Sequence, residues 1–406
     1  MSRSRAGFTV VELMIALTCG GIAISSMYMI GAASMRTFRA QDRVATTQSS
    51  LRSAMAQVKR DFQRAGFLGT PNVNMAGERC TAPVGVPLND ESGGLGVGRL
   101  AAISEYVPGV TAADGGFEDL DPEKLNTWNR IDNVILSGNY LTSGEYMGVI
   151  VAAAGTSLTV PFTTQGFTRD FTHWYSEGGT RTAGSCDGRA LANTFAAGRL
   201  LRVHALSELN AFVAIRSASC DTTNNVARIN LNETIPGNCN ATGGWISPVN
   251  FIRYSVKNAT GDEASRVGKN RVAVLRRTEV DPNNKATALV VTDDDGTTHT
   301  DDRAVLDYVV HFRVDFLMRG SNVNSIDFMP ASQASVAANP ERVRGAIIEL
   351  GARTTEHEPD MAVQDMKVAF PPFRVYGKAG DDTPGAARTR VLRAELLLPN
   401  LANEGY

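Results

Sequence analysis

Hydrophobic residues gather near the amino terminus in one long run, from Phe8 to Met35. The run reads FTVVELMIALTCGGIAISSMYMIGAASM, and Glu12 is its only charged residue. The 23 residues from Leu13 to Met35 carry no charge, which is enough for a helix to cross a bilayer core about 30 Å thick. An ionisable group within a membrane segment is costly, so Glu12 predicts a functional role with a positively charged partner.

The helical pattern continues beyond the apolar run. The first proline is Pro71, and no glycine lies between Met35 and Arg64. Gly66 is suited to end the helix, because glycine readily adopts the left-handed conformation that follows many helices. One helix from Phe8 to Arg64 would be about 85 Å long, with its second half packed on a soluble domain. Apolar residues recur there at helical spacing, at Phe38, Val44, Leu51, Met55, Val58 and Phe62.

From about Gly66 onward, short strands are separated by Gly, Pro, Asn and Asp. Many strands alternate apolar and polar residues, which is typical of antiparallel sheets with one wet face. The glycine-, proline- and acid-rich regions Asn72–Asp121 and Asp360–Ala387 are predicted to be loops. The predicted strands are Asn133–Leu136, Tyr146–Val151, Ser157–Phe162, Leu200–Leu206, Phe212–Ser217, Asn250–Val256, Arg271–Thr278, Ala288–Thr292, Leu306–Met318, Arg344–Thr354 and Arg388–Leu398.

These patterns predict an α+β fold, in which a long amino-terminal helix precedes a large globular head rich in antiparallel β-sheet. The expected segments are a leader at residues 1–7, a membrane or filament-core half-helix at 8–35, an amphipathic half-helix at 36–65 and the head at 66–406. A head of that length can split into two subdomains, and the weakest point for a boundary is Gly243–Pro248. The absence of a repeating βαβ pattern argues against a doubly wound nucleotide-binding fold.

The short leader MSRSRAG precedes the apolar run. A secretory signal is normally cut after its apolar region, whereas here the small residue Gly7 comes before it. Cleavage between Gly7 and Phe8 removes the leader and keeps the apolar helix. The new amine at Phe8 then lies four residues from Glu12, or beside the equivalent glutamate of a neighbouring copy.

The stretch from Gly7 to Ile15, GFTVVELMI, resembles the class III signal of type IV pilins and type II secretion pseudopilins. The resemblance implies a type IV pilin-like fold and cleavage after Gly7 by a prepilin peptidase. It also implies that the new amine of Phe8 is methylated. Glu12 is then the assembly carboxylate, which neutralises the amine of the adjacent subunit in a filament.

The carboxy-terminal third is similar to PilW-type minor pilins in its order of strands. Ala304–Phe316 is followed by an alanine-rich stretch, then by Arg342–Thr354, and the last strand is Arg388–Asn400. The resemblance covers the signal and about the last 100 residues, and residues 66–304 lie outside it. It implies a minor pilin of a bacterial type IV pilus that primes assembly in a tip complex, in support of adhesion and twitching motility.

The same resemblance implies partners and a location. The expected partners are other minor pilins, the major pilin, a PilY-type tip protein, the prepilin peptidase and the inner-membrane assembly platform. The expected location is the inner membrane with the head in the periplasm, and then the base or tip of the extracellular pilus. Arg36, Arg39 and Arg43 follow the apolar run at once, so the rule that positive residues mark the cytoplasmic side does not by itself orient the segment.

Of five cysteines, Cys19 lies in the apolar run, which leaves four in the head. An even number suits disulfides in an oxidising compartment, although four cysteines allow three connectivities. The favoured pairing is Cys220 with Cys239, because they bracket a polar loop whose closure is worth roughly 3 kcal/mol. The second pair would then be Cys80 with Cys186, the two head cysteines that remain. Zinc is a weaker interpretation, because the chain has no CxxC pair and its histidines are scattered.

No catalytic arrangement is found, so neither an enzyme, a cofactor nor a metal is expected. P-loop, nucleophile-elbow and dinucleotide motifs are absent, and His357-Glu358 lacks a second histidine. Carboxylates at Asp293–Asp295, Asp301 and Asp302 are of the kind that binds calcium. Their spacing departs from an EF-hand, and a polar hairpin turn is the preferred interpretation. The net charge of -2 gives no argument for a nucleic-acid partner.

Two alternatives remain open. A GspJ-like pseudopilin of a type II secretion system shares the signal and a sheet-rich head, although such heads are generally smaller than this one. A membrane-anchored, adhesin-like module is the other, with a middle region that recognises a surface or a sugar. Its candidate aromatic residues are Trp128, Trp174, Tyr175 and Trp245.

Overall fold

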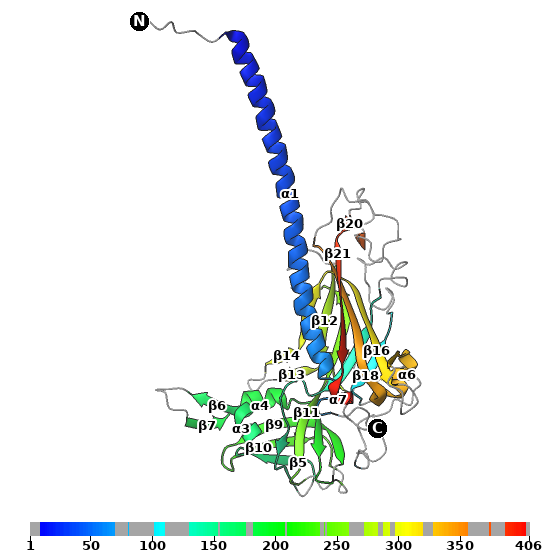
Figure 1. Ribbon diagram of the computed structural model, residues 1–406. Coiled ribbons are helices and arrows are strands. Elements are labelled where there is room, and N and C mark those ends of the chain that lie inside the picture. The colour runs from blue at the N-terminus through cyan, green and yellow to red at the C-terminus, as the bar shows by residue number, and fades with distance from the viewer. Residues whose placement is uncertain are drawn as a thin grey trace.

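The structure is a computed structural model, and one continuous helix dominates it (Figure 1). Helix α1 runs from Val10 to Gln63, 54 residues, so the predicted single helix is confirmed. Its carboxy-terminal cap is Arg64, and Gly66 follows with φ +76°, the left-handed conformation expected there. The structure describes residues 9–69, 80, 101–109, 130–152, 155–175, 182–207, 209–235, 239, 242–259, 272–282, 287–292, 297–319, 328–355, 373–374 and 386–402.

The head covers the last third of α1. Burial begins at Thr47, so the packed stripe starts later than predicted: Val44 is half-buried and Phe38 is exposed. Beyond Thr47 the side chains on one face of α1 are buried in the main hydrophobic core, at Leu51, Ala54, Met55, Val58 and Phe62. This spacing of three and four residues is that of one helical face.

The end of α1 is joined to strand β2 (Asn133–Gly138) by backbone contacts. The N–H of Gly66 donates to the carbonyl of Ser137 at 2.8 Å, and the N–H of Asn139 donates to the carbonyl of Phe67 at 2.8 Å. Gly138 lies between these two bonds, and a Cβ at that position would lie 2.7 Å from the carbonyl oxygen of Arg64. The close approach of helix and strand therefore requires a glycine at position 138.

A four-stranded antiparallel sheet packs beside α1, in the order β17-β16-β18-β21. Phe62 of α1 packs against Phe316 of β16 and Tyr254 of β11 (Trp245–Asn258), with both ring centroids 6.2 Å away. The main core thus lies between α1, the four-stranded sheet and the larger sheet to which β11 belongs. The strands of this sheet are β16 (Val309–Arg319), β17 (Phe328–Pro330), β18 (Val343–Arg353) and β21 (Thr389–Leu397).

The larger sheet of the described residues has 11 strands, in the order β1-β2-β11-β8-β9-β10-β5-β4, with β3 and β12 also paired to β11 and β15 paired to β12. Its strands are β1 (Ile103–Val107), β2 (Asn133–Gly138), β3 (Tyr146–Met147), β4 (Ile150–Val151), β5 (Ser157–Pro161), β8 (Leu200–His204), β9 (Asn210–Asp221), β10 (Val226–Leu231), β11 (Trp245–Asn258), β12 (Ala273–Glu279) and β15 (Asp302–Asp307). The pairings between these strands are antiparallel, which confirms the predicted antiparallel head.

Strand β11 passes from one core to another. Ile246, near its start, belongs to a second core that contains the aromatic rings of Tyr146, Phe167 and Phe171. Tyr254, near its end, belongs to the core beneath α1. The segment Gly243–Pro248 includes the first residues of this strand, so the chain passes between the cores along a strand.

Smaller elements complete the head. The helices are α3 (Gln165–Phe171), α4 (Gly188–Thr194), α6 (Gln333–Ala338), the 3₁₀ helix η1 (Pro340–Arg342) and α7 (Pro399–Ala402). Two-stranded ribbons are formed by β6 (Thr172–Tyr175) with β7 (Thr182–Cys186), β13 (Val290–Thr292) with β14 (Thr298–Thr300), and β19 (Phe373–Arg374) with β20 (Ala386–Ala387). Strands β13 and β14, which flank the polar hairpin turn predicted around Asp293–Asp295, pair with each other, and residues 293–296 lie outside the described residues.

The disulfide pairing differs from the favoured one. Cys80 pairs with Cys239 and Cys186 pairs with Cys220, with Cα atoms 5.5 and 6.0 Å apart. The segment between Cys220 and Cys239, predicted to be a polar loop, contains β10, which pairs with β9 and places Ala227 opposite Cys220. From Ala227, strand β10 runs about 13 Å further to Leu231 and so leads away from Cys220 before the chain reaches Cys239.

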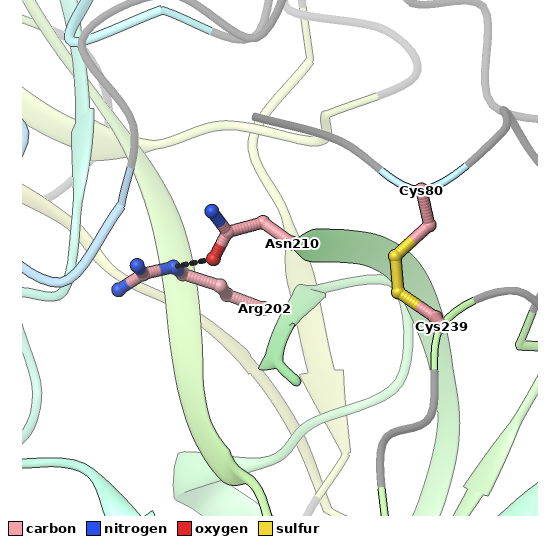
Figure 2. The surroundings of a disulfide bond; sticks show 4 residues. All are labelled: Cys80, Arg202, Asn210 and Cys239. Atoms are coloured by element: carbon pink, nitrogen blue, oxygen red, sulfur yellow. Dashed lines mark hydrogen bonds between the residues drawn. A yellow bond between two sulfur atoms is a disulfide. The ribbon is translucent and has the colours of Figure 1, made fainter. Parts of the chain in front are cut away.

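Figure 2 shows the surroundings of the Cys80–Cys239 bond. The N–H of Cys80 donates to the backbone carbonyl of Asn210 at 3.0 Å. The side chain of Asn210 accepts from Nε of Arg202 at 2.7 Å. Position 80 is therefore held in two ways, by the disulfide to Cys239 and by the backbone hydrogen bond to Asn210 at the start of β9, and both cysteines belong to the second core.

Candidate functional site

The amino-terminal half of α1 makes almost no contact with the head, as Figure 1 shows. Among the described residues, α1 is the one helix that is long and apolar enough to cross a membrane. Removing a large apolar side chain from water is worth about 1.5–3 kcal/mol. The exposed apolar surface of this half-helix therefore requires lipid or other apolar chains around it. Its large side chains are 57–77% exposed, at Val10, Val11, Leu13, Met14, Ile15, Leu17, Ile22, Ile24, Met27, Tyr28, Met29, Ile30, Met35 and Phe38.

Glu12 makes a capping box with Thr9 at the first turn of α1. The N–H and the hydroxyl of Thr9 both donate to Oε2 of Glu12, each at 3.0 Å, and the N–H of Glu12 donates to Oγ1 of Thr9 at 3.3 Å. Within the described part of the chain, Oε1 of Glu12 receives no hydrogen bond. The carboxylate thus stabilises its own helix and keeps one oxygen for an external donor.

The sequence contains a signal for this cap that the hydrophobic pattern alone does not reveal. A threonine followed three residues later by a glutamate is the capping-box pattern, and Thr9 and Glu12 fit it. Gly7 and Phe8, the predicted cleavage and methylation positions, lie outside the described residues. Since α1 begins at Val10, the predicted cleavage point precedes the helix in sequence.

A buried ion pair fixes the other end of α1 to the head. Oδ2 of Asp61 accepts from Nε of Arg277 at 2.6 Å and from the hydroxyl of Tyr254 at 2.7 Å. Nη1 of Arg277 also donates to Asp301 at 2.5 Å. Burial lowers the pKa of the Arg277 guanidinium, but Asp61, with smaller effects of Tyr254 and Asp301, raises it and the net shift is upward, which keeps the cation charged.

A second polar network joins the residues just before β2 to β16 of the four-stranded sheet. Arg130 donates to Asp132 at 2.6 Å and to Asp315 of β16 at 3.1 Å. Asp132 also accepts the N–H of Val314 at 2.7 Å. Burial raises the pKa of Asp132, and these donors oppose the shift. Because its donors come from more than one segment, the carboxylate of Asp132 joins the residues that precede β2 to β16.

The remaining sequence candidates are dispersed. Asp301 pairs with Arg277 and Asp302 pairs with Arg276, and the described residues contain no group of three side chains able to bind a metal. Trp245 is partly exposed at the start of β11, with its ring perpendicular to that of His204 at 5.4 Å. Trp128 lies outside the described residues, and Trp174 and Tyr175 belong to β6.

Comparison with known proteins supports the interpretation of the amino terminus. The prokaryotic N-terminal methylation motif matches residues 2–28, a segment that contains Gly7, Phe8 and Glu12. The match indicates a protein of the type IV pilin or pseudopilin type, anchored in a membrane by the apolar helix. It covers less than a tenth of the 406 residues. No curated protein and no solved structure matched the chain.

Proposed function

We propose that this protein is a PilW-like minor pilin of a bacterial type IV pilus, which primes pilus assembly within a minor-pilin complex at the tip. The observation that carries the proposal is the position of the methylation motif. The motif extends into the first half of α1, whose apolar side chains are exposed, while one face of the last third of the same helix is buried in the head. Such a helix is suited to transfer from lipid into a bundle of similar helices.

Glu12 determines which position in the helix bundle this subunit favours. An unpaired carboxylate in an apolar bundle is costly, so Glu12 favours positions in which a cation lies beside it. The new amine at Phe8 of an adjacent subunit is the cation that prepilin cleavage creates. A subunit that keeps this glutamate therefore has another subunit above it and is not the outermost one.

The further steps of the proposal follow the family resemblance. The prepilin peptidase processes the chain at Gly7, and the inner-membrane platform extracts it together with other minor pilins. The major pilin adds below, and a PilY-type protein associates at the tip. A GspJ-like pseudopilin would also be processed by the prepilin peptidase. The two functions therefore differ in the structure that is assembled, a pilus or a secretion pseudopilus.

Mass spectrometry of the amino terminus of the membrane-extracted protein tests the first step. We expect a chain that begins with methylated Phe8, and an intact Met1 terminus would overturn the proposal. Sheared surface pili then test the second step, since a minor pilin is recovered in them and its deletion abolishes surface pili. A normal pilus yield in the deletion strain, together with loss of protein secretion, would favour the pseudopilin instead.

A further inference from the structure

A helical segment without fully buried residues separates the apolar half of α1 from the part that is packed on the head. We call residues 36–46 the neck, because they follow Met35 and precede Thr47, the first buried residue of α1. The neck is about 16 Å long at 1.5 Å per residue. It contains three arginines, Arg36, Arg39 and Arg43, and one acid, Asp42, which gives a net charge of +2 (three minus one).

Two of these arginines have no partner in the described part of the chain. Arg36 and Arg39 are exposed, and neither makes a hydrogen bond or an ion pair there. Arg43 differs, since it is half-buried and interacts within the molecule. Arg36 and Arg39 are three residues apart and thus project from neighbouring positions on the helix surface.

The position of the pair along α1 coincides with one layer of a membrane. A bilayer is about 40–45 Å thick and its hydrocarbon core about 30 Å, so each headgroup layer is roughly 5–8 Å deep. If the core ends at Met35, Arg36 lies about 1.5 Å beyond it and Arg39 about 6 Å beyond it. Arg43 lies about 12 Å beyond the core, outside the headgroup layer.

We propose that Arg36 and Arg39 bind the phosphate groups of anionic lipids in the leaflet on the head's side of the membrane. Guanidinium groups bind phosphate oxygens in a bidentate manner, and their aliphatic stems lie along the apolar surface while the charge reaches the headgroups. The pair then fixes the depth of the span and holds the head at the distance set by the neck. This inference requires that α1 spans a membrane and is independent of the pilus function.

Native mass spectrometry of the full chain, released from nanodiscs of phosphatidylglycerol and phosphatidylcholine, tests the proposal. The measured quantity is the ratio of the two lipids that remain bound. We expect phosphatidylglycerol to dominate for the wild type and the ratio to fall roughly thirtyfold in Arg36→Gln/Arg39→Gln, because each arginine near an anionic surface contributes about fivefold. High salt should weaken the preference of the wild type as well.

A matched control uses two exposed arginines of the same helix. Arg52→Gln/Arg60→Gln removes the same charge from positions beside the head and should leave the lipid ratio unchanged. Arg36→Lys/Arg39→Lys keeps the positive charge and should retain most of the preference for phosphatidylglycerol. Flotation with vesicles of the same lipids establishes insertion of each variant. An unchanged ratio in Arg36→Gln/Arg39→Gln, or an equal fall in the control, overturns the proposal. The amino-terminal mass of the same sample reports separately on prepilin processing.

Discussion

Asp61 of α1 and Arg277 of β12 form the ion pair that attaches the helix to the head, with Nε 2.6 Å from Oδ2. Both side chains are almost fully buried, and the hydroxyl of Tyr254 completes the shell of Asp61. The pair lies beside Phe62, which is fully buried and packs on Phe316. The last turns of α1 therefore contact the head through a charged pair and an aromatic ring that are adjacent in the chain.

Removal of the Asp61 carboxylate should strongly destabilise the head. Asp61→Ala leaves Arg277 buried with Asp301 as its remaining acid, and loss of one partner of a buried pair costs about 3–5 kcal/mol. Asp42→Ala is the matched control, since Asp42 is exposed on the same helix and its loss should change the free energy of unfolding by less than about 0.5 kcal/mol. Chemical denaturation of the full chain in detergent measures both, and equal midpoints would contradict this role of Asp61.

Gly138 should tolerate no side chain. A Cβ there would lie 2.7 Å from the carbonyl oxygen of Arg64, so Gly138→Ala must displace the end of α1 from β2, at a cost of about 1–3 kcal/mol. Gly144→Ala is the control, because the position that its methyl group would take has no neighbouring atom within 4 Å. Thermal unfolding should separate the two variants, and similar melting temperatures would show that the junction is loose.

His311 predicts an acid-sensitive step in stability. Nδ1 of His311 accepts the N–H of Arg130 at 3.1 Å, and Nε2 donates to Glu349 at 3.2 Å. Burial lowers the pKa of His311 below its ordinary value of 6.5; Glu349 opposes this shift, while the nearby cations Arg313 and Arg130 add to it. Below pH 6.5 the unfolded chain therefore binds a proton that the folded chain does not, so stability falls as the pH decreases.

The slope from this one group is at most about 1.4 kcal/mol per pH unit. His311→Gln removes the titrating ring and retains one acceptor and one donor. Its free energy of unfolding should fall less steeply than that of the wild type between pH 6.5 and 5. His299→Gln, at an exposed position of β14, should keep the wild-type slope. A wild-type slope in His311→Gln would assign the acid sensitivity to other groups.

The long helix and its end were predictable from the sequence because they depend on local features. A charge-free run, the absence of proline, the spacing from Leu51 to Phe62 and the glycine at 66 act within a few residues. Strand β10 was missed because Asn, Thr and Arg surround its apolar residues Val226, Ile229 and Leu231. Its stability comes from β9 and β5 on either side, and this tertiary context has no local signal.

The ion pair of Asp61 and the correct disulfides were missed for a related reason. Asp61 lies among the charges of an amphipathic helix, and its partner is 216 residues away in the sequence. The length of the segment from Cys220 to Cys239 misleads, because that segment contains a strand. Sequence separation is a poor guide where a sheet brings distant segments together, as with Cys80 and Cys239, which are 159 residues apart.

A non-reducing peptide map should distinguish the two disulfide patterns. Arg228 lies between Cys220 and Cys239, and Arg199 lies between Cys186 and Cys220, so trypsin separates all these cysteines. We expect linked peptides that contain Cys80 with Cys239 and Cys186 with Cys220. In the chain-entropy model, the loops of 159 and 34 residues correspond to roughly 5 and 4 kcal/mol of stability. A peptide that links Cys220 to Cys239 would contradict the fold around β10.

Glu12 combines two roles, a helix cap and a proposed charge partner, and one substitution separates them. Glutamine at the third position of a helix still completes a capping box, so Glu12→Gln retains the bond to the N–H of Thr9 and loses the charge. Glu12→Val loses both. If the carboxylate acts by pairing with a neighbour's amine, both variants should be processed to Phe8, remain in the membrane and be absent from sheared pili.

Recovery of Glu12→Gln in pili at the wild-type level, with Glu12→Val still absent, would assign the effect to the helix cap. Thr9→Val is the complementary variant, because it removes the hydroxyl that donates to Glu12 and leaves the charge in place. Under the charge-pairing proposal Thr9→Val should enter pili, although with a frayed first turn. Co-purification of the other minor pilins from membranes then tests whether the same charge is needed before filament growth begins, since the proposed priming complex forms while Glu12 is still within the bilayer.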